Sequence, residues 1–364
     1  MTPKTQTALV QSRASSTNFS LSFAIEPSCP LADSPSPYHV LVRVCAVSLN
    51  PSDWKAPKRF FVEGNGVGCD FCGFVEEAGP LSKIGPRARV CGAIIAMYKA
   101  SDSHKGAFAQ YTWADSRRLL RVPESWSAVQ AAALGAVSWS TSGAAISDPE
   151  ALGLAGLPSK PADKPIPVLV YGGATATGIM TTQLLKLSGY LPIAVCSPKS
   201  SALVKRCGAV GTASYLSSSI VQDIKKIAHG VPIRHAIDCV TTPESVSDCM
   251  SVIARTGGRY ACLEVIPETC VLRRAVKVKV VMAYETENVD TDLNHPVYSR
   301  KANAELHGIV MTWTKDIQSL LDRGALIVKP LHELNEGFEG IIEGLDMLRR
   351  GDLQDRKLVA VVPS

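Results

Sequence analysis

The 364-residue chain lacks the features that would place it in an export pathway, in a membrane or on nucleic acid. The starting segment MTPKTQTALVQSR has no apolar core of the kind that a signal peptide or an anchor needs. The uncharged stretch Trp126 to Ser147 is long enough to span a bilayer, but five Gln, Ser and Thr side chains interrupt it, so we expect a buried helix and loop. The formal net charge is only +5, from scattered basic residues. We therefore predict a cytoplasmic protein with no membrane or nucleic-acid partner.

Cysteine is not scarce, but the spacings that give it a structural or metal-binding role are missing. Eleven cysteines run from Cys29 to Cys270 without the pattern of a disulfide framework. Cys69 and Cys72 form a C-x-x-C, and neither a second pair nor spaced histidines follow to complete a zinc site. We expect reduced, mostly buried thiols and no metal.

The length of the chain exceeds what one hydrophobic core usually organises, so we expect two domains. Residues 1–120 show short alternating runs between Pro and Gly clusters, typical of a β-rich domain. From Val168 onward strands and helices alternate, which predicts an α/β domain with a doubly wound parallel sheet. The closing strand Lys357 to Val362 has no place in that sheet, and we return it to the first domain. The predicted domains are 1–160 together with 306–364, and 161–305.

The stretch PVLVYGGATATGIM, which begins at Pro167, has the pattern of an apolar strand, a glycine turn and the start of a helix. A helix entered near Ala176 aims its first free N–H groups at one point, where an anion binds. Gly172 and Gly178 match the dinucleotide pattern G-x-x-G-x-x-G, but Thr175 replaces the middle glycine. A tight turn of purely structural origin would look similar, so the cofactor interpretation depends on the rest of the chain.

The second strand of this domain lacks the acidic residue that would hold the ribose 2′-hydroxyl of NAD. It ends in Cys196-Ser197-Pro198-Lys199, and Ser197, Lys199 and Lys205 offer donors and positive charge that suit a 2′-phosphate. This favours NADPH over NADH. The alternative is that the two lysines lie on a solvated helix face, which leaves the preference open.

A second candidate site, Asn50-Pro51-Ser52-Asp53-Trp54-Lys55, follows the strand Val40 to Leu49 directly. Side chains that emerge at the end of a rigid element are well placed to position a substrate. Two roles stay open for Asp53, which either orients Lys55 or caps the turn after the proline.

These motifs, in this order, resemble the medium-chain dehydrogenase/reductase superfamily over nearly the whole chain. The order is a β-rich domain, NPSD, GCDFCG, an AAAL helix, the glycine turn, the βαβ region and a C-terminal return. Zinc alcohol dehydrogenases of this family carry a catalytic cysteine where this chain has Asn50, and G-H-E where it has Gly68-Cys69-Asp70. Both ligand positions are substituted. The resemblance thus implies a zinc-free quinone or enoyl reductase with a GroES-like catalytic domain and a Rossmann domain.

Within that branch the chain looks most like the trans-acting enoyl reductases of fungal polyketide synthases. The shared segments are VLVYGGATAT, LLKLSGYLPIAVCSP, RHAIDC, GGRY and RRGDLQDRKLV. The resemblance implies hydride transfer from NADPH to the β-carbon of an α,β-unsaturated polyketide thioester on the acyl carrier of a partner synthase. Two alternatives stay open: a stand-alone quinone or enone oxidoreductase, and a pocket protein that binds, isomerises or cyclises a polyketide without redox chemistry.

The resemblance also implies the residues of the site. Thr175, Ala176 and Thr177 would contact the pyrophosphate, Ser197 and Lys199 the 2′-phosphate, and Tyr215 the adenosine. The full predicted cofactor set is Asn50, Pro51, Ser52, Asp53, Gly172, Thr175, Ala176, Thr177, Ser197, Lys199 and Tyr215.

Two residues are predicted to be catalytic. Lys55 matches the lysine after NPSD near the reacting carbons of the enoyl reductases, and it is our candidate donor to the enolate oxygen. Thr141 sits near an active-site threonine of the family, although the surrounding GAVSWSTSG is one residue longer than the usual pattern.

The expected partner is an acidic acyl-carrier domain, and Lys55, Lys58 and Arg59 are candidates for a cationic docking rim. Zinc-free relatives often dimerise through edge strands, here Lys277 to Ala283, whereas the polyketide enoyl reductases resemble monomers. We predict a monomer.

Overall fold

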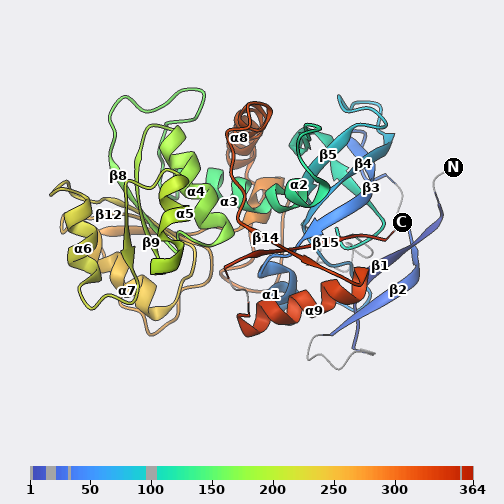
Figure 1. Ribbon diagram of the computed structural model, residues 1–364. Coiled ribbons are helices and arrows are strands. Elements are labelled where there is room, and N and C mark those ends of the chain that lie inside the picture. Colours follow the sequence, from blue (N-terminus) through green and yellow to red (C-terminus); the bar gives the residue numbers. More distant parts are fainter. Residues whose placement is uncertain (1–2, 14–21, 32–33, 96–104, 353–354, 364) are drawn as a thin grey trace. The chain divides into compact units, whose positions relative to one another are not determined.

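The computed structural model describes residues 3–13, 22–31, 34–95, 105–352 and 355–363 (Figure 1). The chain forms two compact units. Unit 1 comprises Met1–Val137, Leu321–Arg323 and Lys329–Ser364, and unit 2 comprises Ser138–Leu320 and Gly324–Val328.

These boundaries lie at other residues than those predicted, because two helices join unit 2 from outside the range 161–305. Helix α3 (Val137–Ser147) bonds to helix α4 (Ala176–Leu187) through the hydroxyls of Ser142 and Thr181, whose oxygens are 2.8 Å apart. Helix α8 (Ala304–Asp322) in turn packs on α3, since the Trp313 indole Nε1 donates to the Ser147 hydroxyl at 3.0 Å.

Unit 1 is β-rich. Its seven-stranded sheet has the order β14-β15-β3-β4-β5-β7, with β6 also paired to β3, and β1 and β2 form a separate two-stranded sheet. The strands are β1 (Thr5–Gln11), β2 (Phe23–Pro30), β3 (His39–Ser48), β4 (Asp70–Ala78), β5 (Arg89–Ala93), β6 (Tyr111–Asp115), β7 (Leu120–Arg121), β14 (Leu331–Leu334) and β15 (Lys357–Val361). The closing strand β15 runs antiparallel to β3, so the end of the chain completes the sheet that its beginning starts.

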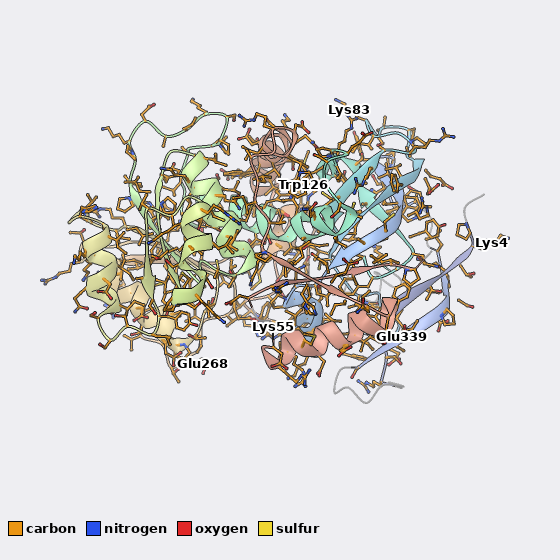
Figure 2. All side chains as sticks on the ribbon, in the orientation of Figure 1. Lys4, Lys55, Lys83, Trp126, Glu268 and Glu339 are labelled. Carbon is orange, nitrogen blue, oxygen red and sulfur yellow. The ribbon has the colours of Figure 1, made fainter. Side chains whose placement is uncertain are left out.

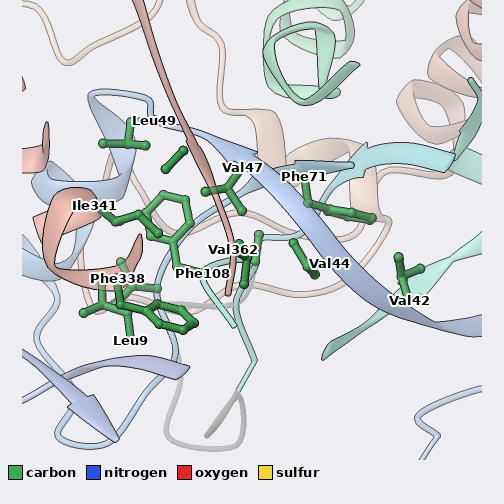
Figure 3. Close-up of a cluster of buried hydrophobic side chains, with 14 of the residues drawn as sticks. Leu9, Val42, Val44, Val47, Leu49, Phe71, Phe108, Phe338, Ile341 and Val362 are labelled. Atoms are coloured by element: carbon green, nitrogen blue, oxygen red, sulfur yellow. The ribbon is translucent and has the colours of Figure 1, made fainter. Parts of the chain in front are cut away.

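The core of unit 1 lies between this sheet and helix α9 (Gly337–Arg350) (Figure 3). Phe338, Ile341, Ile342 and Leu345 recur at the spacing of one helix face, and all four are buried. Each such side chain contributes about 1.5–3 kcal/mol when it leaves water. The same helix lies against α1 (Ser52–Arg59), which carries Lys55 (Figures 1 and 2).

The uncharged segment around residue 135 folds into α2 (Ala128–Leu134) and α3, whose side chains are mostly buried. Ser127 begins α2 with a capping box that involves Gln130. No helix of the described residues is both long enough and apolar enough to cross a membrane.

Unit 2 contains a six-stranded parallel sheet in the order β10-β9-β8-β11-β12-β13. The strands are β8 (Pro167–Tyr171), β9 (Leu191–Cys196), β10 (Gly211–Ser214), β11 (His235–Asp238), β12 (Gly258–Cys262) and β13 (Val276–Val280). Helices α4, α5 (Ser201–Arg206), α6 (Ile220–Ile227) and α7 (Pro243–Val252) connect them. The chain moves outward in one direction from β8 to β10 and in the other from β11 to β13. This doubly wound order confirms the predicted fold class and puts a switch point between β8 and β11, where such sheets bind ligands.

Candidate active site

A buried ion pair lies where β3 of unit 1 ends. Lys357 begins β15 and Asp70 begins β4. Lys357 is 5% exposed and Asp70 is 0% exposed. The Lys357 ammonium donates to the Leu49 carbonyl at 2.9 Å and to Asn50 Oδ1 at 2.6 Å, and it lies 3.8 Å from Asp70 Oδ2. Burial lowers the pKa of Lys357, and the negative charges of Asp70 and Asp53 oppose that shift.

Asp70 connects this ion pair to the start of α3. Its Oδ2 accepts from Asn50 Nδ2 at 2.8 Å, and its Oδ1 accepts from the backbone N–H groups of Ala136 and Val137 at 2.8 and 2.9 Å. Gly135 leaves room for the carboxylate, because a Cβ there would lie 2.2 Å from Asp70 Oδ1. The buried charge therefore has donors on both oxygens, as a buried carboxylate requires.

The Asp53 carboxylate contacts the turn that leads into α1. Its Oδ2 accepts from the Asn50 backbone N–H at 2.7 Å, and its side chain is fully buried. This contact reaches back to the residue before Pro51, and the first residues of α1 have no side-chain cap, so both predicted roles of Asp53 stay predictions. Burial raises the pKa of Asp53 to about 7, against the lowering effect of hydrogen bonds from Cys69 and from the Asn50 N–H.

Of the residues that the resemblance compares with zinc ligands, Asn50 and Asp70 bond to each other and Asn50 bonds to Lys357. Cys69 hydrogen-bonds with Asp53 and Ser52 instead. Among the residues described, no group of three or more His, Cys, Asp or Glu side chains is arranged to hold a metal ion. The positive charge beside Asp70 is the Lys357 ammonium. This network positions the first turn of α1. Lys55 lies in the same helix and is half-buried (Figure 2).

In unit 2 the glycine turn after β8 needs its glycines for different reasons. Gly172 has a φ of +75°, which favours glycine. A Cβ on Gly173 would lie 2.7 Å from the Ala194 Cβ, and one on Gly178 would lie 2.2 Å from the Gly172 carbonyl oxygen. The backbone can therefore pass this close to the sheet only with these three residues.

Thr175 replaces the expected middle glycine without strain. Its φ of −67° is open to any residue, and its hydroxyl caps α4 by accepting from the Gly178 N–H at 2.9 Å. The N–H groups of Ala176 and Thr177 have no acceptor within the described part of the chain. Two backbone donors and the positive end of the helix are thus left for an anion.

Three other residues predicted to bind the cofactor, Ser197, Lys199 and Tyr215, lie at the same carboxyl ends of the unit 2 strands. Ser214 pairs in register with Cys196, so Tyr215 and Ser197 each follow the end of one of two adjacent strands. Tyr215 is 51% exposed, and the Ser197 hydroxyl shares a hydrogen bond with that of Ser200 at 2.8 Å. Lys199 lies exposed in the short helix that follows β9.

Asp238, at the end of β11, organises the turn that faces Gly172 and was not among the predicted site residues. Its buried carboxylate accepts from the Ser245 hydroxyl at 2.6 Å, from the Tyr260 hydroxyl at 2.8 Å and from two backbone N–H groups of the turn, at 2.9 Å each. The segment RHAIDC contains Asp238, but nothing in it indicates that Ser245 and Tyr260 are the hydrogen-bond partners. The role of Lys357 could not be predicted for the same reason, because it is a single lysine in an apolar strand far from Asn50 in the chain.

Thr141 lies on α3, is 6% exposed, and belongs to unit 2, as the glycine turn does. Its neighbour Ser142 contacts α4, because the Ser142 hydroxyl donates to the Ser138 carbonyl and bonds with Thr181. Lys55 belongs to unit 1. The two predicted catalytic residues therefore lie on separate units.

Known proteins share this chain's sequence along nearly its whole length. Residues 36–124 match the alcohol dehydrogenase GroES-like domain. The chain is 54% identical over 353 residues to the trans-enoyl reductase sthE of Phaeosphaeria nodorum, which covers 97% of this chain and 96% of that protein. It is 45% identical over 373 residues, and over the full length of both chains, to the trans-enoyl reductase calK of Penicillium decumbens. The chain belongs to the trans-enoyl reductase family. The predicted family is confirmed, and the protein is an oxidoreductase of the medium-chain dehydrogenase/reductase superfamily.

Solved structures support the fold of this trans-enoyl reductase. The CurK enoyl reductase superposes with a TM-score of 0.69 at 14% identity, covering 98% of this chain and 99% of that one. An alcohol dehydrogenase superfamily protein from Novosphingobium aromaticivorans superposes with a TM-score of 0.75 at 19% identity, covering 99% and 100%. At such identities the likeness concerns the fold alone, which is a GroES-like domain with a Rossmann domain. Membership of the superfamily implies a nicotinamide cofactor.

Proposed function

We propose that this trans-enoyl reductase uses NADPH to reduce the α,β-double bond of a polyketide thioester carried by the acyl carrier of a partner synthase. The observation that carries the proposal is the open glycine turn at the β8/β11 switch point. Its two unpartnered N–H groups, on Ala176 and Thr177, and the tight approach at Gly178 fit a pyrophosphate.

The residues at the carboxyl edge of the unit 2 sheet fit the rest of NADPH. Gly172, Thr175, Ala176 and Thr177 would hold the pyrophosphate. Ser197 and Lys199 would hold the 2′-phosphate, and Tyr215 would contact the adenosine. No acidic residue lies between Cys196 and Ser201, so nothing there repels a phosphate.

For the NPSD segment we propose a more limited part in cofactor binding. The Asn50 and Asp53 side chains already bind groups of unit 1, so we propose that they act by shaping the loop. Pro51 and Ser52, which are respectively exposed and half-buried, stay predicted cofactor contacts.

NADPH, held by the residues named above, would supply the hydride that adds to the β-carbon. The electrons of the double bond then form an enolate, whose oxygen needs a donor. We propose the Lys55 ammonium for that role, with water as the source of the proton that the α-carbon takes up. Thr141 is proposed as a second polar group of the site.

The variant Lys55→Ala tests this assignment. We expect kcat/KM for an enoyl thioester to fall by about 10²- to 10³-fold, the usual effect of losing one donor to a developing oxyanion. NADPH affinity, measured by fluorescence titration, should not change. With a carrier-free enoyl thioester as substrate, so that the predicted docking rim has no effect, Lys58→Ala is the matched control, because Lys58 lies on the same helix with its ammonium 5.9 Å from the Trp54 ring centroid. Full activity in Lys55→Ala would remove this lysine from the mechanism.

Two further measurements separate the alternatives. Turnover of a simple quinone but not of a carrier-bound enoyl thioester would favour a stand-alone quinone reductase. An absence of saturable NADPH binding would favour a pocket protein without redox chemistry. We also propose a monomer, which sedimentation equilibrium tests directly.

A further inference from the structure

Unit 2 has a concave surface at the ends of its strands opposite to those that carry the glycine turn. This pocket, of about 980 Å³, is lined by residues 230–234, 250–256, 269–271 and 273 together with parts of α6 and α7. Those three segments lead into β11, β12 and β13, so the pocket lies at the amino-terminal ends of the strands. The proposed NADPH contacts follow the carboxyl ends.

Arg273 holds two walls of the pocket together. Its Nη1 donates to the carbonyls of Met250 and Ile253 at 2.8 and 2.7 Å, and its Nη2 donates to those of Ala254 and Arg255 at 2.8 and 3.1 Å. These bonds satisfy the free carbonyls at and beyond the end of α7. The pocket is therefore preformed, which lowers the entropic cost of binding.

The charges that line the pocket have one sign. Lys225, Arg234, Arg255 and Arg273 line it, and no carboxylate does. The first three are exposed, and none of them forms an ion pair with a carboxylate of the described residues. Glu268, labelled in Figure 2, is adjacent in sequence to Thr269 but is not among the lining residues.

Apolar side chains surround these cations. Val231 and Val271 line the pocket and are 50% and 84% exposed, and the neighbouring Leu272 is 43% exposed. Ile233 and Met250 contribute buried apolar lining. Exposed apolar groups within a polar, arginine-containing rim are the composition of a protein interface.

We propose that this pocket docks an acidic amphipathic segment of the partner polyketide synthase. The proposal rests on the proposed function, which supplies the partner. Carboxylates of the segment pair with Lys225, Arg234 and Arg255, and its apolar face covers Val231 and Val271. Complementary charge raises the rate of encounter, and the apolar contacts slow dissociation. Docking at this edge leaves the carboxyl edge of the sheet open to NADPH.

The test compares two double variants with the same change in charge. Lys225→Glu with Arg255→Glu alters the pocket, whereas Lys160→Glu with Lys164→Glu alters two exposed lysines outside it. Affinity for the purified partner synthase is measured by surface plasmon resonance, without turnover, at two salt concentrations. We expect the pocket variant to bind about tenfold more weakly and with less salt dependence, while the control binds as the wild type does.

A third variant guards against misfolding. Val271→Asp changes a side chain that is already mostly exposed, with Val289→Asp, 55% exposed in the wild type, as its control.

The native Cys270 lines the pocket, so its alkylation, read by mass spectrometry, should slow when the synthase is bound. The proposal would be overturned if the Lys225→Glu/Arg255→Glu variant and Val271→Asp both bound the synthase as the wild type does. It would also be overturned if the pocket mediated self-association, or if the wild type bound inorganic phosphate saturably and both of these variants lost that binding. Turnover of a free enoyl thioester is measured separately, so loss of reductase activity would count against the proposed function and not against docking.

Discussion

The polar centre of unit 1 and the glycine turn of unit 2 both lie at strand ends, but the first consists of charged and polar side chains and the second of backbone groups. In unit 1 the charges are side chains, and Lys357, Asp70 and Asn50 satisfy one another out of contact with water. In unit 2 the binding groups are backbone N–H donors, and those of Ala176 and Thr177 have no protein acceptor within the described residues.

This difference decides how each site responds when one of its residues is substituted. Buried polar groups need partners, and in unit 1 the lysine of the closing strand supplies them to the Leu49 carbonyl and the Asn50 amide oxygen. Substitution of the middle glycine by Thr175 leaves the backbone donors where they were, because that position does not need a positive φ. We therefore expect a substitution in the side-chain site to disturb its remaining members, while the backbone site keeps its donors when a side chain changes.

The largest expected effect is on stability and concerns the buried centre formed by Lys357, Asp70 and Asn50. Lys357→Met removes the cation and leaves the Asp70 carboxylate buried without it, so we expect unit 1 to lose about 3–5 kcal/mol of stability. Urea unfolding gives the total, and hydrogen exchange of β3 and β15 peptides locates the loss. Lys357→Met combined with Asp70→Asn should recover part of it, because the unpaired charge is then absent. A loss below about 1 kcal/mol would mean that the pair is not coupled.

The next effect concerns Asp53 and depends on pH. Its folded-state pKa of about 7 lies above the ordinary value of 3.8 for this side chain, so between these values the unfolded chain releases a proton that the folded chain keeps. Stability from this group is therefore present at low pH and lost as pH rises to about 7. Asp53→Asn should remove that loss and gain on the order of a few kcal/mol relative to the wild type as pH rises from about 4 to 7. A difference that is constant with pH would contradict the buried titration.

A smaller effect is expected in the backbone site. Gly178→Ala places a methyl group 2.2 Å from the Gly172 carbonyl oxygen, so the turn must shift. We expect NADPH affinity to fall at least about tenfold, equivalent to about 1.4 kcal/mol. Fluorescence titration measures it, with Gly230→Ala as a control in which the added Cβ meets nothing within 4 Å, although its φ of +79° adds some strain. Equal affinity in both variants would show that the close approach is not needed.

The smallest effect tests the substituted glycine itself. Thr175→Ala removes the hydroxyl that caps α4 and should cost about 1 kcal/mol of unit 2 stability. Thr175→Ser keeps that hydroxyl and is the matched control. Because the free N–H groups belong to Ala176 and Thr177, both variants should still bind NADPH. Complete loss of binding in Thr175→Ala alone would make the hydroxyl a cofactor contact in its own right.

Much of unit 2 could be predicted because its signals are local. The alternation of strands and helices, the glycine turn and the absence of an acid after Cys196 can all be identified from neighbouring residues. The Asp238 and Lys357 partners could not be predicted. The Asp70 oxygens receive donors from Asn50 and from residues 136 and 137, and Lys357 is more than 300 residues away from Asn50 in the chain.

By itself the sequence determined the family, the doubly wound order of the second domain and the residues of the glycine turn. These follow from periodicity and from motifs that lie within one strand, turn and helix. Only the tertiary structure decided that α3 and α8 join unit 2, that the Asp53 carboxylate accepts from the Asn50 N–H, and that Lys357 provides the cation beside Asp70. The physical reason is that a buried charge takes its partners from whatever segments the fold brings within hydrogen-bond distance, and linear spacing does not encode that distance.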